Sequence, residues 1–299
     1  MTKLTKATYV KISLVILLCL VLCGGIFSCS VGCSRAFQQF NKHFMTEFDA
    51  AQFENMGSAN INADDIKNIE LQWLAGAVDV VLDESNSNEI VLSETSSSRM
   101  PERQKMRWRV HNNTLQVAYG WEQSWLVGCS ATSHKNLTLT IPKTLGEHLD
   151  SFTLQAASGT YNLGSIGCDS LKIDLASGNV NSEKLRANKL QINVASGDAN
   201  IRGVFSQLVD LDIASGGINL TCLQECPSNA NLQIASGNVD MTLPTDSSFL
   251  ATVDKMSGSF TCNFPTNNTQ QNDNVYKVGS GKSNFNVFIA SGRVTFNQA

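Results

Sequence analysis

The feature that most constrains the fold of this chain is a tripeptide, Ala-Ser-Gly, that recurs through its second half. Six copies and one Met-Ser-Gly variant end at Gly159, Gly178, Gly197, Gly216, Gly237, Gly258 (the variant) and Gly292. Successive glycines are 19, 19, 19, 21, 21 and 34 residues apart. A nearly constant period of this length is typical of repeat folds, in which one copy cannot bury its apolar face alone and stacked copies share a core.

The residues around each glycine alternate as they do in β-strands. In the copy ending at Gly178, the apolar residues are Leu171, Ile173 and Leu175 before the glycine and Val180 after it. The alternation therefore changes parity at Ser-Gly, and later side chains would face outward unless the backbone bends there. Glycine can adopt the dihedral angles of such a bend. The sequence predicts an all-β fold, a β-solenoid or stack of sheets with turns of about 19 to 21 residues.

The region before residue 151 follows the same plan less regularly. Residues 69–80 place apolar side chains at the same offsets around Gly76 and are expected to form a degenerate first copy. We expect the Ser-rich stretch 93–98 to be a loop. Further strands are expected at 89–92, 106–110, 114–117 and 137–142. The β region is accordingly divided into an irregular part, 61–150, and regular repeats, 151–299.

The N-terminal segment has the length and composition of a membrane anchor. Residues 12–33 carry no charge, and a spanning helix needs about 20 such residues. Three lysines precede it: Lys3, Lys6 and Lys11. Basic residues favour the cytoplasmic side, so residues 1–33 are predicted to be a cytoplasmic N-terminus and one transmembrane helix, with the rest of the chain extracytoplasmic. A cleaved signal peptide is the alternative, and lipidation at Cys29 or Cys33 is a further one.

An amphipathic helix is predicted within the following juxtamembrane segment, 34–60. Phe37, Phe40, Phe44 and Phe48 recur at steps of three and four residues, which places them on one helical face. This face could lie on the membrane or bind a partner helix. The alternative is that it packs on the end of the β domain as a cap.

The ordered combination of these β motifs resembles a known family. Residues 69–80, then Ser93-Glu94-Thr95, then 136–142 and the Ala-Ser-Gly strands look like the bacterial "putative adhesin" domain of unknown function, a toast-rack-like β-solenoid. The resemblance extends from about Ile66 to the C-terminus. It implies a bacterial envelope protein of a kind often placed beside envelope stress-response systems, and it implies no catalytic residues.

The residue types that carry catalysis are poorly placed in this sequence. No histidine follows residue 151, so the repeated serines lack the usual base. The four histidines show no metal-ligand spacing: His43, His111, His134 and His148. Asp174 and Asp212 share one offset, and Asp79 and Asp240 share another, which indicates outward polar rows; calcium binding along the second row is the lesser alternative. We predict no catalytic residue, cofactor or metal.

Cys222 and Cys226 lie in the first copy that is lengthened to 21 residues. A disulfide between them would fix a small loop, and disulfides are stable outside the cytoplasm. We therefore name this pair as a candidate disulfide.

Charge and topology together define the expected partners. The net charge is −4 and no basic block is present, which argues against nucleic acid binding. We expect a non-enzymatic, membrane-anchored scaffold or adhesin of the cell envelope that binds an envelope protein or a surface glycan and that can self-associate through an open solenoid end. The alternative is a carbohydrate-active enzyme on a β-helix scaffold, which requires converging carboxylates.

Overall fold

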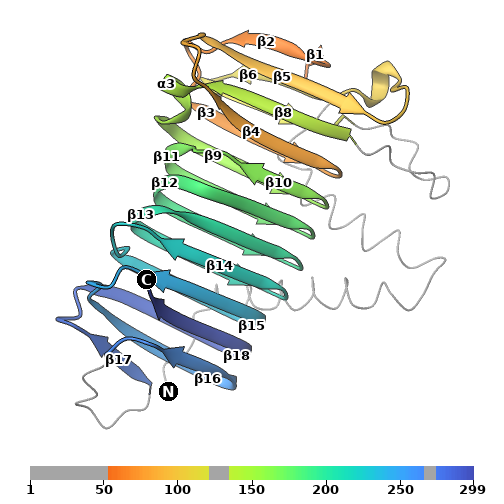
Figure 1. The fold of residues 1–299 in the computed structure, drawn as a ribbon. Helices are drawn as coiled ribbons and strands as arrows, with labels where there is room; N and C mark the ends of the chain where they lie inside the picture. Colours follow the sequence, from red (N-terminus) through yellow and green to blue (C-terminus); the bar gives the residue numbers. More distant parts are fainter. Residues whose placement is uncertain (1–52, 121–134, 266–273) are drawn as a thin grey trace, which may run out of the picture.

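Each copy of the repeat contributes strand segments to two arms that face each other across a shared core (Figure 1). The computed structural model describes residues 53–120, 135–265 and 274–299. Their strands are hydrogen-bonded into one 18-stranded sheet. The glycine corners fold this sheet into a leading arm, made of the segments before each glycine, and a trailing arm, made of the segments after it.

The strands and short helices follow one another in this order: β1 (Asn55–Met56), β2 (Ala59–Asn62), β3 (Asn68–Trp73), β4 (Ala77–Asp83), β5 (Glu89–Ser96), η2 (Glu102–Gln104), β6 (Arg107–His111), β7 (Thr114–Ala118), β8 (Lys135–Pro142), α3 (Lys143–Gly146), β9 (Leu149–Ala156), β10 (Thr160–Leu163), β11 (Gly167–Leu175), β12 (Asn179–Val194), β13 (Asp198–Ile213), β14 (Gly217–Cys222), β15 (Asn229–Leu243), β16 (Phe249–Cys262), β17 (Val275–Val278) and β18 (Ser283–Gln298).

The predicted glycine corners are confirmed, and their geometry explains why glycine recurs. Gly178 has a φ of +100°, which side chains rarely allow. A Cβ at Gly178 would lie 2.3 Å from the carbonyl oxygen of Gly159, the corner of the neighbouring copy. Corners stack so closely that any side chain would collide with the backbone beside it. The alternating apolar residues then face one core, in which Leu190 and Ile192 are fully buried.

Neighbouring copies pair in parallel, and the degenerate first copy belongs to the same stack. β3 pairs with β9 in the leading arm, and β4 pairs with β10 in the trailing arm. The predicted loop at 93–98 is wrong for residues 93–96, since β5 continues to Ser96 and pairs antiparallel with β8. This strand continues because its Glu94 side chain is buried against a lysine, a contact that the serine-rich composition does not reveal.

The last copy does not stack in sequence order. β18 lies between β15 and β16, so Val294 is paired with Val239 on one side and with Phe260 on the other (Figure 1). β16 is thereby displaced to the end of the solenoid, where the short strand β17 pairs antiparallel with its first four residues. The chain crosses over within the 34-residue spacing that interrupts the repeat.

The N-terminal predictions lie outside the described residues. These are the anchor within 1–33 and the helical face formed by Phe37, Phe40, Phe44 and Phe48. Among the described ranges, none of the helices has the length and apolar character needed to cross a bilayer.

Candidate functional site

A ladder of stacked amide side chains runs along the outer face of the trailing arm. Asn162 donates to Asp79 at 2.7 Å, and Asn181 donates to Asn162 at 3.3 Å. Asn200 then donates to Asn181 at 3.3 Å, and Asn219 donates to Asn200 at 2.7 Å. Every amide donates in the same direction, toward the carboxylate of Asp79. The outward polar row predicted at this offset is therefore present.

The ladder meets a second carboxylate at its other end. On the next strand, Asp240 is paired with Asn219. The amide nitrogen of Asn219 already donates to Asn200. The Asn219 atom that faces Asp240 is therefore the carbonyl oxygen Oδ1. An ionised carboxylate only accepts hydrogen bonds, and in the described part of the chain no hydrogen bond joins these two side chains. The ladder has a carboxylate, which can only accept, at each end. One pair of neighbouring side chains in it must therefore lack a donor, and that pair is Asn219 and Asp240.

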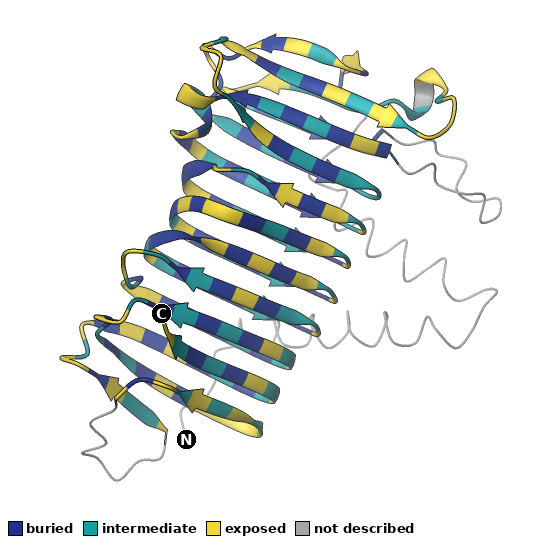
Figure 2. Ribbon diagram, viewed as in Figure 1, coloured by how far each residue is buried: buried dark blue, intermediate teal, exposed yellow. Residues whose placement is uncertain are grey.

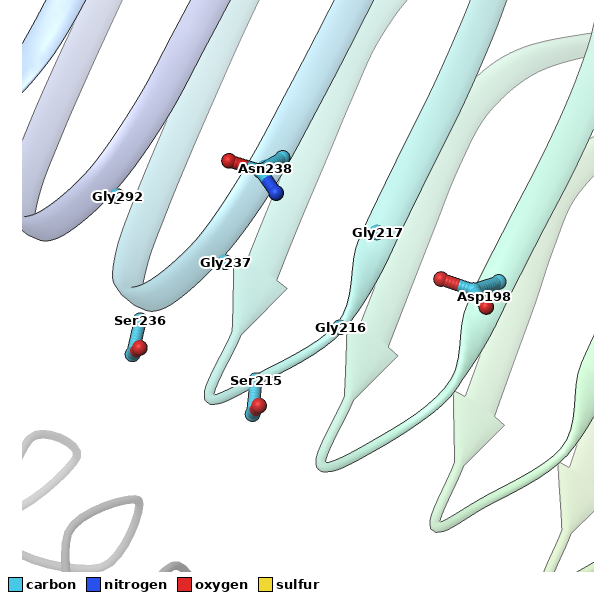
Figure 3. Close-up of a pocket in the computed structure, with 8 residues that line it drawn as sticks. All are labelled: Asp198, Ser215, Gly216, Gly217, Ser236, Gly237, Asn238 and Gly292. Carbon is cyan, nitrogen blue, oxygen red and sulfur yellow. The ribbon is translucent and has the colours of Figure 1, made fainter.

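A shallow depression lies beside this junction (Figure 3). Gly217 stands on the trailing arm between Asp198 and Asn238, so the row of side chains is interrupted there. The depression has a volume of about 490 Å³ and is lined by Asp198, Ser215, Gly216, Gly217, Ser236, Gly237, Asn238 and Gly292. We call it the Gly217 notch. Gly217 and Asn219 are two residues apart and share the outward face, so the notch and the unmatched junction adjoin.

Gly217 differs from the corner glycines in its surroundings. Its φ is not in the left-handed region, and an added Cβ would meet only the Asp198 carboxylate, at 2.8 Å. The backbone therefore does not demand glycine here, and the effect of this residue is to leave space. Figure 3 shows the Asp198 and Asn238 side chains on the two sides of that space.

The chemistry of the notch is that of hydrogen bonding to a polar ligand. Carboxylates, an amide and two hydroxyls line or border it, and Arg293 is paired with Asn238 on the adjacent strand. The lining contains no aromatic ring on which a ligand could stack. Within residues 53–120, 135–265 and 274–299, no group of three or more His, Cys, Asp or Glu side chains could hold a metal ion.

The polar row of the leading arm is internally paired. Asn193 donates to Asp174 at 2.5 Å, and Lys172 forms an ion pair with the same carboxylate at 3.0 Å. A carboxylate held in this way accepts hydrogen bonds from its own neighbours. The repeated serines, such as Ser177 and Ser196, are exposed at the corners.

A buried polar cluster closes the N-terminal end of the solenoid. The Nζ of Lys135 lies 2.8 Å from the Glu94 carboxylate, and the two side chains are 1% and 2% exposed. It also donates to the carbonyl oxygens of Gln104, at 2.7 Å, and Tyr119, and it lies 5.3 Å from the ring centroid of Trp73. We call Trp73, Glu94, Tyr119 and Lys135 the N-terminal plug.

The function of this plug is structural, because the three donors of the ammonium group all have partners. Burial lowers the pKa of Lys135, while the hydrogen bond and charge of Glu94 oppose that shift. Sequence reasoning missed this pair, since the two residues are far apart in the chain and lysine is rarely buried. The structure places the pair beside the corner of the first copy, where a Cβ on Gly76 would lie 2.0 Å from the Lys135 carbonyl oxygen.

The candidate disulfide is not formed in the structure, where Cys222 and Cys226 are free thiols. Cys222 points into the core from β14 and is 1% exposed, and burial raises its pKa. Cys226 lies in the following loop, where burial also raises the thiol pKa and a hydrogen bond with Ser283 opposes the shift. The inward strand position of Cys222 directs its sulfur into the core.

The fold and the site together define a β-solenoid with glycine corners and a polar outer face. A family model described as Toastrack DUF4097 matches residues 66–297, and the chain belongs to that family. The sequence resemblance is thereby confirmed.

Two solved structures are similar to the chain over 82% of its length, each at 12% identity. One is titled a "putative cell adhesion protein" from Clostridium sporogenes. The match includes 100% of that protein's chain and has a TM-score of 0.35. The other, titled a "putative adhesin" from Bacteroides fragilis, is covered over 98% with a TM-score of 0.44. Among curated proteins, none matches the sequence.

Proposed function

We propose that this chain is a non-enzymatic, adhesin-like binding protein of the bacterial cell envelope that recognises hydroxyl-rich ligands, namely surface glycans, through the trailing arm. The observation that carries the proposal is the unmatched acceptor junction between Asn219 and Asp240 beside the Gly217 notch. The binding residues are Asp198, Asn219, Asn238 and Asp240. Their oxygens need donors, and sugar hydroxyls both donate and accept hydrogen bonds.

The rigidity of the site supports this proposal. The ladder fixes the amide of Asn219 through a chain of hydrogen bonds that extends back to Asp79. Parallel strands hold the notch residues in register. A preformed set of hydrogen-bonding groups loses less conformational entropy when a ligand binds. Polysaccharides present repeated hydroxyls, and a solenoid with repeated outward rows suits an extended ligand.

Anchoring of the domain outside the cytoplasm is part of the proposal. It is supported by the uncharged residues 12–33 and the lysines that precede them. We expect the β domain to be accessible to protease added to intact spheroplasts, and full-length chain to remain in the membrane fraction after a high-salt wash. A β domain protected from protease in intact spheroplasts would contradict this topology.

The binding site is tested by two matched substitutions at the ends of the ladder. Asp240→Asn introduces an amide that can donate to Asn219, which removes the unmatched junction. Asp79→Asn makes the same chemical change at the other end, where the new carbonyl oxygen still accepts from Asn162. Both variants lose one negative charge, and only the first alters the unmatched junction beside the Gly217 notch.

The measurement is binding of the full chain to an array of purified envelope oligosaccharides. We expect Asp240→Asn to weaken binding at least about tenfold, equivalent to about 1.4 kcal/mol, and Asp79→Asn to bind as the wild type does. Equal affinity of all three chains, or no binding to any glycan, would contradict the proposal. Release of new reducing ends from a bound glycan would instead establish the carbohydrate-active enzyme.

A further inference from the structure

Several carboxylates on the outer face of the solenoid are satisfied by the neighbouring copy. Asp79 accepts a hydrogen bond from Asn162 at 2.7 Å, and Asp169 accepts one from Asn188 at 2.8 Å. Asp174 is held in the same way by its own neighbours. Carboxylates of this kind need no donor from a ligand, because asparagine amides on the adjacent strand already supply one.

The two carboxylates at the Gly217 notch are not satisfied in this way. Asp198 lines the notch, and Asp240 is paired with Asn219 at the unmatched junction beside it. In the part of the chain that the structure describes, neither carboxylate has a hydrogen bond or an ion pair with another side chain. The trailing arm alternates between buried and exposed positions (Figure 2), and Asp198 is exposed while Asp240 is half-buried. Both carboxylates are therefore accessible to a ligand from solvent.

The unmatched junction offers hydrogen-bond acceptors alone. The Asn219 amide nitrogen donates to Asn200 at 2.7 Å, so the atom that faces the Asp240 carboxylate is Oδ1. A hydroxyl placed there would donate its single proton and find no side-chain donor for its own lone pairs. An ammonium group carries three donors and no acceptor. Its hydrogen bonds to a carboxylate are also shorter and stronger than those between neutral groups, so an ammonium group matches the junction better than a hydroxyl does.

The charges around the notch also favour a cation. Along strands β10 to β16, the outward rows that contain Asp198 and Asp240 include one basic side chain, Arg293. Arg293 is paired with Asn238, on the side of the notch away from Asp198. Two carboxylates and one guanidinium leave the notch negative, in a chain whose net charge is −4. A positively charged ligand group is attracted to the side of Asp198 and Asn219.

We propose that the glycan bound at the Gly217 notch contains amino sugars with free primary amino groups. One ammonium group donates to Asn219 Oδ1 and to the Asp240 carboxylate. Asp198, two strands away from Asp240, accepts from a further donor of the same polymer. An N-acetylated amino sugar cannot make the first contact equally well, because its amide nitrogen is neutral and has a single proton. This inference rests on the proposed function and names the chemistry of its ligand.

The test uses the full chain and two oligosaccharides that differ only at nitrogen. One is an oligomer of glucosamine, and the other is the same oligomer after complete N-acetylation. Binding is measured slightly below neutral pH, where the amino groups of the ligand are protonated, and at about 0.15 M salt, which screens long-range attraction to an acidic chain. We expect the free-amine oligomer to bind at least about tenfold more tightly than the acetylated one.

Two variants assign this preference to the junction. Asp240→Asn removes the carboxylate and introduces a donor beside Asn219, so this variant should bind the two oligomers with nearly equal affinity. Asp79→Asn loses the same charge at the other end of the ladder, where the new carbonyl oxygen still accepts from Asn162. It should keep the full preference for the free amine.

The outcomes separate this inference from the proposed function. If the wild type binds other glycans but does not prefer the free-amine oligomer, the inference is overturned and the proposed function stands. If no glycan binds, both are overturned. A preference that Asp240→Asn leaves intact would show that the oligomer is held by overall charge rather than at the junction, and would overturn the inference as well.

Discussion

The two ends of this solenoid close the same repeating core by different physical means. The N-terminal plug buries an ion pair, in which the Lys135 Nζ and the Glu94 carboxylate are 2.8 Å apart, among aromatic rings. The other end is filled by aromatic side chains that we call the C-terminal plug: Phe249, Phe264, Phe285 and Phe296. Phe249 stacks on Phe285 with centroids 4.8 Å apart and meets Phe264 edge-on at 5.3 Å.

The difference shows what each end permits. Antiparallel strands and a fully paired ammonium group leave the N-terminal end without an ordinary repeat edge. The C-terminal plug fills the core, and residues 254–262 of β16 pair with β18 on one side and with no described strand on the other. The N-terminal end is therefore closed by a polar cluster under antiparallel strands, and the C-terminal end by aromatic packing alone.

The largest loss of stability is expected from breaking the ion pair of the N-terminal plug. Lys135→Met leaves the Glu94 carboxylate buried without its partner. Loss of one member of a buried ion pair costs about 3–5 kcal/mol, although the backbone amide of Met106 would still donate to Glu94 at 2.9 Å. We expect a matching decrease in the free energy of unfolding, measured by urea denaturation.

The matched control for this substitution is Lys143→Met. Lys143 pairs with Glu84 at 2.9 Å, but the two side chains are 44% and 73% exposed. Exposed ion pairs contribute about 0–1 kcal/mol, so the stability should change little. Equal losses for the two variants would show that the N-terminal plug does not hold its end of the solenoid.

A smaller effect is expected at the aromatic end. Phe249→Leu keeps an apolar side chain in the core and removes the contacts with Phe264, Phe285 and Phe296. We expect a loss of about 1–2 kcal/mol, because aromatic pairs contribute about 0.5–1.5 kcal/mol beyond their buried area. Urea denaturation measures this loss in the free energy of unfolding. A loss larger than that of Lys135→Met would show that the aromatic end, and not the polar end, contributes more to stability.

The last effect appears only at high pH and is expected at the N-terminal plug alone. Burial, and secondarily the charge of Glu94, raises the pKa of Tyr119 from 10.0 to about 12. The folded state therefore favours the protonated phenol, so this contribution to stability is complete below pH 10 and is lost as the pH rises to 12.

Tyr119→Phe should accordingly lose less stability than the wild type between pH 10 and 12. The comparison uses urea midpoints of both chains across that range, with neutral pH as the reference. The same slope in both chains would show that Tyr119 ionises equally easily in the folded and unfolded states.

The regular part of the fold could be predicted from the sequence because each copy repeats one local rule. The parity change at Ser-Gly located the corners, and apolar offsets around Gly76 identified a first copy outside the regular region. The outward placement of Asp79, Asp240 and the asparagines followed from the same offsets. Local alternation determines which face a side chain occupies.

The features that could not be predicted depend on contacts between distant residues. Alternation indicates that β18 is a strand but not which strands it lies between. The serine-rich composition hid the Glu94 contact with Lys135. The direction of the amide ladder, and hence its unmatched junction at Asp240, depends on hydrogen bonds among five strands rather than on any single offset.

The position of β18 is central to the proposed binding site. Gly292 lines the notch only because β18 lies beside β15. Sequence order would instead place the copy ending at Gly258 beside the copy ending at Gly237.

Two cysteine pairs in the full chain distinguish these arrangements directly. Asn238 is paired with Arg293, whereas Ser259 lies on the far side of β18. Adjacent strands are about 4.8 Å apart and next-nearest strands about twice that, and a disulfide requires Cα atoms within about 7 Å. On mild oxidation, Asn238→Cys with Arg293→Cys should form a cross-link, identified by peptide mass spectrometry, and Asn238→Cys with Ser259→Cys should not. A cross-link in the second pair but not in the first would contradict this account of the fold and of the binding site.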